Sequence, residues 1–306
     1  MRRFALPFAL SCGFALAACA EERVNPNPQP DVRTDTGADT GTAEDATVTD
    51  SGTGPEDSGT PPRDAGDAGP LCTPNNDGVI ERAEMPYALG AQVLYVVNDD
   101  NTTVDGINTA PRDTPSGPEW DFSAMRAGDR RVLDEVQSPM GKWWQPLYPS
   151  ATFALPIDRA ASLFALYRSG SNALEILATV SRDMARTNIL FNPAVDAIRF
   201  PLREGSSWTV TSTGNGFLNG IANSTVNTWR FTVDRRGTAL TPATRFPVLR
   251  LRMDLDQTVT GTVIRRTQRT YLFLSECWGL VARVASVDNE MSMEFTRASE
   301  YRRLGL

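Results

Sequence analysis

The stretch that decides the fold is Leu249-Arg250-Leu251-Arg252-Met253-Asp254-Leu255-Asp256, in which every odd position is apolar and every even position is charged. Successive side chains of an extended chain point to opposite faces, so this alternation predicts a β-strand with one buried and one solvated face. Residues 228–233 alternate in the same way, with Trp229, Phe231 and Val233 as the apolar members. Two such strands indicate an antiparallel sheet that is wet on one side.

Shorter segments of the same kind surround these two. Turn signals separate them, among them Ser169-Gly170-Ser171-Asn172, Gly214-Asn215-Gly216, Arg236-Gly237 and Cys277-Trp278-Gly279. The Ala and Leu content of residues 158–167 also allows a short helix there. We expect residues 91–306 to form one all-β domain, a single curved antiparallel sheet that is half-barrel or barrel-like. The further predicted strands are 92–97, 131–136, 162–168, 173–181, 188–191, 196–202, 207–212, 263–274, 278–287 and 291–296.

The amino-terminal residues have the pattern of an export signal. Arg2 and Arg3 precede an apolar run that ends in Leu16-Ala17-Ala18-Cys19, and the run is shorter than the roughly 20 residues of a membrane span. This pattern resembles the signal of bacterial lipoproteins. The resemblance implies that residues 1–18 are removed and that a lipid on Cys19 anchors the protein in the outer membrane, facing the periplasm or the cell surface. The alternative is an ordinary secretory signal in which Cys19 is incidental.

Charge is concentrated near the amino terminus. The formal net charge is −7, and residues 20–71 contain twelve acids, three arginines and no aromatic residue. Subtracting these, together with Arg2 and Arg3, leaves 25 acids and 25 bases in residues 72–306. A neutral domain without a basic stripe argues against nucleic acid as a partner. The acidic segment cannot bury enough apolar area to fold, so residues 19–71 are expected to be the lipidated cysteine and a disordered tether.

Two cysteines remain beyond the signal and the anchor, Cys72 and Cys277. In an exported protein such a pair is expected to form a disulfide. The alternative is two separate thiols.

The loop Cys72-Thr73-Pro74-Asn75-Asn76-Asp77-Gly78-Val79-Ile80-Glu81-Arg82-Ala83-Glu84 resembles a calcium loop of the EF-hand or dockerin type when it is aligned on its glycine. Thr73 stands where the first Asp of such a loop is expected. We expect residues 72–90 to form an Asn/Asp-Gly turn followed by a short capped helix that Pro86 ends, with a calcium loop as the alternative. The resemblance implies four possible calcium ligands: Asn75, Asp77, Glu81 and Glu84.

The chemistry available to the chain is narrow. It contains no histidine and a single lysine, Lys142, so arrangements that use a histidine base, or a Ser-x-x-Lys motif, are not present. No cofactor is expected apart from the possible calcium ion. Glycoside hydrolysis by two carboxylates would need a pair facing one another. The acids considered for such a pair are Glu119, Asp121, Asp134 and Glu135.

An aromatic cluster, Trp143, Trp144 and Tyr148, is a candidate binding patch for a sugar or a protein surface. The alternative is that it belongs to the core or to a loop folded onto the sheet. We therefore expect a non-enzymatic binding or structural module of the cell envelope, with the membrane as its partner through the lipid. The second hypothesis is a carrier that holds a lipid or another apolar ligand in a concave sheet, and the third is a hydrolase.

The second half of the domain, residues 200–281, resembles a family of exported bacterial domains of unknown function. The resemblance implies a curved antiparallel sheet and assigns no activity. The residues that carry it are Pro201, Gly205, Trp208, Thr241-Pro242, Phe246-Pro247, Gly279 and Val281.

Overall fold

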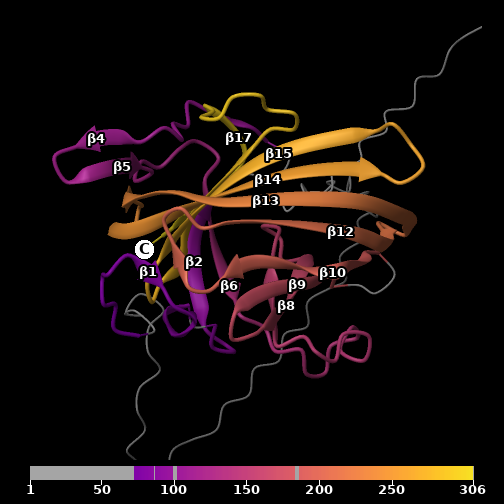
Figure 1. Cartoon of the computed structure of the whole chain (residues 1–306). Coiled ribbons are helices and arrows are strands. Elements are labelled where there is room, and N and C mark those ends of the chain that lie inside the picture. The colour runs from indigo at the N-terminus through magenta and orange to yellow at the C-terminus, as the bar shows by residue number, and fades with distance from the viewer. Residues whose placement is uncertain (1–71, 86, 99–101, 183–185, 306) are drawn as a thin grey trace, which may run out of the picture.

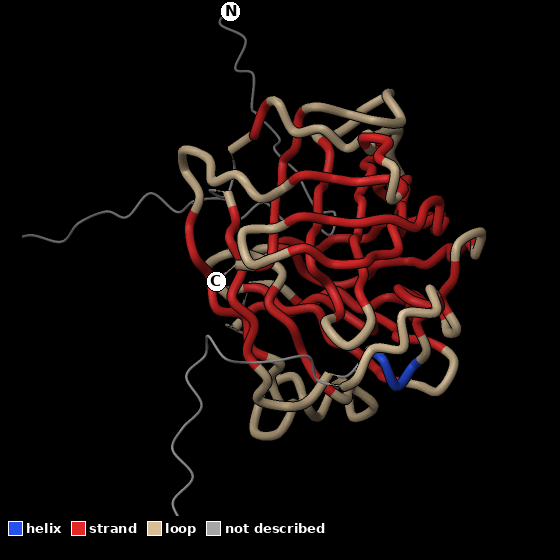
Figure 2. The backbone as a smooth tube through the Cα atoms, turned by 90° about the vertical axis from the view of Figure 1, so that its left-hand side faces the viewer, coloured by secondary structure: helices blue, strands red, loops and turns tan. Residues whose placement is uncertain are grey.

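The computed structural model describes residues 72–85, 87–98, 102–182 and 186–305. Nearly all of the regular structure in this part of the chain is strand, with one short 3-10 turn, η1, at Arg82–Glu84 (Figure 2). The predicted signal peptide, the lipidated Cys19 and the acidic tether lie outside the described residues. Within them, no helix is long and apolar enough to cross a membrane.

One sheet dominates the structure (Figure 1). Its main path runs β6-β2-β17-β16-β15-β14-β13-β12-β10-β9-β8-β7, and every pair of neighbours on this path is antiparallel. The bounds are β2 Gln92–Val97, β6 Arg130–Glu135, β7 Phe153–Pro156, β8 Leu163–Ser169, β9 Ala173–Ser181, β10 Asn188–Arg199, β12 Ser207–Leu218, β13 Ile221–Leu240, β14 Arg245–Val259, β15 Arg265–Ser275, β16 Gly279–Ser286 and β17 Arg297–Leu304.

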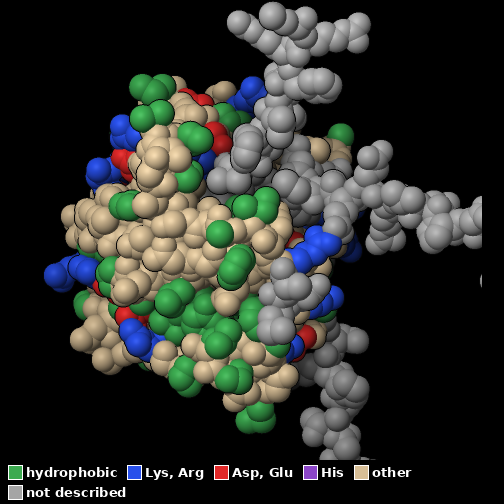
Figure 3. Space-filling view, turned by 90° about the vertical axis from the view of Figure 1, so that its right-hand side faces the viewer, with side chains coloured by type: hydrophobic (Ala, Val, Ile, Leu, Met, Phe, Trp, Pro, Cys, Tyr) green, Lys and Arg blue, Asp and Glu red, His purple; other side chains and the backbone are tan. Residues whose placement is uncertain are grey.

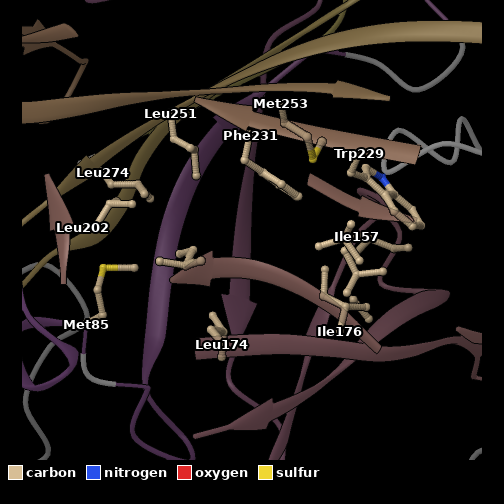
Figure 4. Packing of buried hydrophobic residues seen from close by; sticks show 14 of the residues in the cluster. Met85, Ile157, Leu174, Ile176, Leu202, Trp229, Phe231, Leu251, Met253 and Leu274 are labelled. Carbon is tan, nitrogen blue, oxygen red and sulfur yellow. The ribbon is translucent and has the colours of Figure 1, made fainter. Parts of the chain in front are cut away.

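The two ends of this path meet. Gln137, just after β6, and Ala154, in β7, form a bridge in which each backbone N–H donates to the other's carbonyl at 2.9 Å. The sheet is therefore nearly closed and barrel-like, as the sequence predicts. Apolar side chains fill much of its interior, and those of β13 and β14 point toward those of β9 (Figure 4).

The deciding stretch of β14 is a strand with Leu249, Leu251, Met253 and Leu255 buried in the interior, as predicted. Its other face is covered at Arg250 and partly exposed at Arg252, Asp254 and Asp256. Arg250 is only 2% exposed, and its guanidinium pairs with Asp234 at 2.8 Å and with Glu294 at 2.9 Å. The prediction of a solvated face fails at Arg250 because further segments of the chain cover the outside of β14.

One covering segment comes from residues 104–125 and contains β3 Val104–Asp105, β4 Arg112–Thr114 and β5 Gly117–Asp121. The rings of Trp120 and Phe122 lie with their centroids 5.1 and 4.9 Å from that of Phe273 on β15. Strand β5 pairs with β13 in parallel, the one departure from antiparallel pairing among the described strands. These contacts make a second apolar cluster outside the sheet.

Several sequence predictions about strand ends are wrong. Strand β8 confirms the strand predicted at 162–168 in place of the alternative helix, whereas the predicted strands 188–191 and 196–202 merge into the bulged β10. The predicted strand 291–296 is irregular, and the strand lies at β17 instead. The polar composition of β17 hides it, because buried ion pairs replace the apolar alternation.

Two predicted turns are strand interiors. Gly214-Asn215-Gly216 lies inside β12, and Arg236-Gly237 lies inside β13. A Cβ on Gly216 would clash with the carbonyl of Asn188, and one on Gly237 would clash with the carbonyl of Pro118. These glycines permit close approach of a neighbouring strand rather than a reversal of the chain.

The amino-terminal loop is fastened to the sheet at three points. Cys72 and Cys277 form the predicted disulfide, with their Cα atoms 5.0 Å apart. The carboxylate of Glu276 accepts the backbone N–H of Asn76 at 2.7 Å, and β1 Val79–Ile80 pairs with β11 Leu202–Arg203. The disulfide, the Glu276 hydrogen bond and the β1–β11 pairing together hold residues 72–80 against the end of the barrel-like sheet.

The ends of the long hairpins expose apolar side chains. Hydrophobic side chains gather on the side of the molecule that faces the viewer in Figure 3. This is the side on which the β12–β13 and β14–β15 hairpins end (Figure 1). Exposed large apolar side chains near these ends are Phe217, Ile221, Val263 and Ile264.

Candidate ligand-binding cavity

A cavity of about 170 Å³ lies inside the barrel-like sheet. One wall comes from β13, β14 and β15, which contribute Phe231, Met253 and Leu272. The facing wall comes from β9 and includes Leu174 and Ile176. Phe231 and Met253 point from their strands toward Leu174 and Ile176 (Figure 4). The alternation along these strands puts the apolar residues on the inside, so the same sequence pattern that forms the sheet also makes the cavity apolar.

Charged side chains gather at one part of the lining. Asp134 on β6, Arg283 on β16 and Arg302 on β17 all border the cavity. Arg302 pairs with Asp134 and, at 3.2 Å, with Glu300, which is also 3.3 Å from Arg283. All four side chains are at most 11% exposed. Two carboxylates and two guanidinium groups therefore form a nearly buried ionic cluster against an apolar space.

The Asp134 carboxylate is unusual within this cluster. Burial raises the pKa of Asp134 from 3.8 to about 6, although the neighbouring Arg302 guanidinium lowers it. Oδ2 accepts a hydrogen bond from Arg302, whereas no described residue donates to the buried Oδ1. Buried polar atoms in folded proteins are nearly always paired, so this sealed oxygen without a donor disfavours the charged form of Asp134.

Tyrosines complete the lining without adding charge. The hydroxyl of Tyr95 donates to the carbonyl of Leu280 at 2.8 Å, and the Arg302 guanidinium lies 5.2 Å from the centroid of the Tyr95 ring. Burial raises the pKa of Tyr95 and Tyr87 and raises that of Tyr167 to about 12. All three phenols therefore stay neutral at physiological pH.

The four acids considered for a hydrolase are not brought together. Of them, only Asp134 borders the cavity. Glu119 pairs with Arg112 and, at 3.0 Å, with Arg245 on the outer layer, while Asp121 accepts the backbone N–H of Ser123. Glu135 follows Asp134 on β6 and points to solvent, since adjacent residues of a strand face opposite sides.

The residues of the calcium-like loop are engaged with the backbone. Asn75 accepts the N–H of Asp77 at 2.9 Å, Asp77 accepts that of Val79 at 2.7 Å, and Glu84 accepts that of Glu81 at 2.9 Å. This is the hydrogen bonding of a turn followed by a capped helical turn. Among the described residues, no three or more Asp, Glu, Cys or His side chains are arranged to hold a metal ion.

The aromatic cluster lies in a third apolar cluster outside the sheet, against β8 and β9. Trp144 is 3% and Tyr148 8% exposed, and Trp143 packs beside them with its indole N–H donated to the carbonyl of Ser181 at 3.1 Å. The hypothesis of an exposed patch is corrected by this burial. These rings stabilise the segment that covers the outside of the sheet.

The sequence did not single out Tyr95, Arg283, Glu300 or Arg302. The available signal was weak, because isolated charges within strands are normally assigned to a solvated face. Opposite charges on neighbouring strands would indicate buried ion pairs, but the sequence does not show which strands are neighbours in the sheet.

Comparisons with known proteins give little further information. No protein-family model matches the chain, and no curated protein matches it. Among solved structures, the fold is similar to that of "a putative lipoprotein from Parabacteroides distasonis ATCC 8503", with a TM-score of 0.34 and 10% sequence identity. The similarity covers 72% of this chain and 95% of that one. The resemblance of residues 200–281 to an exported family of unknown function stays a prediction.

Proposed function

We propose that this protein is a non-enzymatic lipoprotein of the cell envelope that carries a small, largely apolar ligand in the interior of its barrel-like domain. The observation that supports this proposal is the cavity of about 170 Å³ lined by Phe231, Met253, Leu174 and their neighbours. Of the three hypotheses from the sequence, the carrier is favoured by a lined cavity. The hypothesis of an aromatic binding patch is not supported, because Trp144 and Tyr148 are buried. The hydrolase is not supported either, because only one of the four acids considered for it, Asp134, borders the cavity.

The size of the cavity sets the size of the ligand. A dry cavity of about 150 Å³ accepts a molecule such as benzene, so about 170 Å³ suits a single substituted ring or a short branched chain. An apolar occupant that fits would remove apolar surface of the walls and of the ligand from water, which gives the site a physical reason to bind.

The anchor and the tether that the sequence predicts would hold such a domain beside a membrane. With a lipid on Cys19, an acidic segment 20–71 that behaves as the expected tether would let the domain move over roughly 40 Å while attached. Apolar molecules concentrate in membranes, so a tethered carrier would collect or deliver its ligand there. The absence of histidine from the chain supports a role without catalysis. Nucleic acid is not a proposed partner, and a protein or carbohydrate partner is not specified.

Titration of the full chain with p-xylene tests this function. We expect a saturable heat of binding by calorimetry and a rise in the unfolding midpoint as p-xylene increases, because the ligand binds the folded state. Ala197→Phe, which fills part of the cavity, is expected to abolish both signals. Ala222→Phe makes the same change at an exposed position of β13 and is expected to leave both signals intact. Absence of binding by the parent protein would contradict the proposal.

A further inference from the structure

We propose that the ends of two neighbouring hairpins, residues 216–223 of β12–β13 and 259–264 of β14–β15, insert into the surface of a lipid bilayer. These two segments together are the hairpin tips. The proposal goes beyond the proposed function, because it concerns a surface outside the cavity and requires no ligand inside it.

The hairpin tips are joined to one another. Asn219 and Gly220 have positive φ angles of 49° and 78°, as in the tight two-residue turn that closes a β-hairpin. The backbone N–H of Thr260, on the second hairpin, donates to the carbonyl of Ser224 at 2.9 Å. The Ser224 hydroxyl also donates to Oγ1 of Thr260 at 2.9 Å. The two ends therefore form one continuous surface.

Large apolar side chains project from both faces of the hairpin tips. Val263 is 98% exposed, and Phe217, Ile221 and Ile264 are 53–66% exposed. Ile221 pairs with Leu218, so these two side chains share a face, and Phe217 precedes Leu218 and points to the other face. A flat protein partner would cover one face of such an end, whereas the interfacial region of a bilayer surrounds it. Hydrophobic side chains gather on this side of the molecule (Figure 3).

The hairpin tips carry no charge that a bilayer would desolvate. Residues 213–229 and 257–264 contain no Asp, Glu, Lys or Arg. The charges that follow on β14 and β15 are Asp256 and Arg265, which pair with each other at 2.5 Å. Arg186, whose carbonyl accepts the N–H of Gly220 at 2.6 Å, is exposed beside the first hairpin, and arginines at the edge of a bilayer keep their charged end in the polar region. The tips can therefore enter the bilayer surface without burying an ion.

The length of chain between the predicted anchor and the domain permits this contact. The Arg236 guanidinium donates to the carbonyl of Asp77 at 3.2 Å, which places the start of the domain far along β13 from the tips. The distance from Arg236 to Ile221 is about 50 Å, at about 3.3 Å per residue. The 52 residues between Cys19 and Cys72 can extend to about 170 Å. A lipid on Cys19 and the hairpin tips can therefore reach the same bilayer, which makes the membrane the partner that this surface meets.

The test reads the position of one tryptophan. The full chain with Val263→Trp is reconstituted in phosphatidylcholine vesicles, with and without bromine on the acyl chains, because bromine quenches only those indoles that approach it closely. The parent protein gives the signal of the native tryptophans, which is subtracted. We expect bromine to lower the added fluorescence at least about twofold, since apolar side chains of interfacial segments reach roughly 5–10 Å into the boundary of the acyl chains.

Two matched variants show whether the apolar side chains cause the contact. The tip variant adds Phe217→Ser, Ile221→Ser and Ile264→Ser to Val263→Trp, and quenching is expected to be lost. The control variant adds the same change at three residues outside both hairpins that are similarly exposed, at 49–57%, and quenching is expected to remain. These are Leu89, Met125 and Leu133. Because all six side chains are exposed, both variants are expected to keep the unfolding midpoint of the Val263→Trp protein.

Four results would overturn the proposal. The first is equal fluorescence of Val263→Trp with and without bromine, a result that needs no further variant to be folded. The second is equal quenching of Leu133→Trp, because the domain would then contact the bilayer with no preferred face. The third is quenching that persists in the tip variant. The fourth is emission of Val263→Trp that shifts to shorter wavelength with rising protein concentration, without vesicles, and is not quenched by bromine, because a second copy of the chain would then cover the tips.

Discussion

Asp134→Asn is expected to change how the stability of the protein depends on pH. Burial raises the pKa of Asp134 from 3.8 to about 6 in the folded protein. A difference of about 2 units corresponds to about 3 kcal/mol of folding free energy. Because the folded value is the higher one, the folded state binds the proton more tightly. The contribution to stability is therefore complete below about pH 4 and is lost as the pH rises through 6.

Asn is uncharged at every pH and has nearly the shape of the protonated carboxyl group. The parent and the variant should therefore have similar unfolding free energies near pH 4. As the pH rises to 7.5, the variant should become more stable than the parent by about 3 kcal/mol, since only the parent must keep a charge in the nearly buried site. Burial is the main cause of the raised pKa of Asp134; the Arg302 guanidinium lowers this pKa, and the neighbouring carboxylates of Glu300 and Asp158 raise it further.

Urea unfolding of both proteins from pH 3.5 to 8 measures the difference, with Glu135→Gln as the matched control. Glu135 is the exposed neighbour of Asp134 on β6, so its substitution should give a difference in unfolding free energy that stays nearly constant with pH. A constant difference for Asp134→Asn as well would refute the assignment of Asp134 as a carboxylate destabilised by burial.

Three further expectations concern the termini of the described chain and the anchor. Replacing both Cys72 and Cys277 with Ser should lower the free energy of unfolding by about 2–5 kcal/mol, because the disulfide closes a long loop; equal stability of the two proteins would contradict this. Titration with calcium to millimolar concentration should leave the unfolding midpoint of the parent unchanged, and a rise that disappears in Glu84→Gln would show that the loop binds the ion. Cys19→Ala should move the protein out of the detergent phase in a partition assay, and unchanged partitioning would contradict the lipid anchor.

The sequence predicts the parts of the fold that rest on alternation. Leu249, Leu251, Met253 and Leu255 read as one buried face, and they line the interior as expected. Alternation could not show that the opposite face is also covered. The burial of Arg250 depends on residues 104–125 and on Glu294, which are distant in sequence and have no periodic pattern.

The candidate site was less predictable, for a related reason. Asp134 is one of the four acids that the sequence singles out, but its partner Arg302 comes from β17, a strand that the sequence does not predict. In Arg297–Leu304 the inward positions include Glu300 and Arg302, so the usual apolar signal of a strand is missing. Buried ion pairs can be recognised only when the order of strands in the sheet is known.

A crystal structure of the full chain grown with saturating p-xylene tests the central claim most directly. The account predicts electron density for one ring inside the barrel-like sheet, between Phe231 and Met253 on one wall and Leu174 and Ile176 on the other. Density for the compound only at the exposed hairpin ends, or a cavity closed by side chains with no compound in it, would contradict the account.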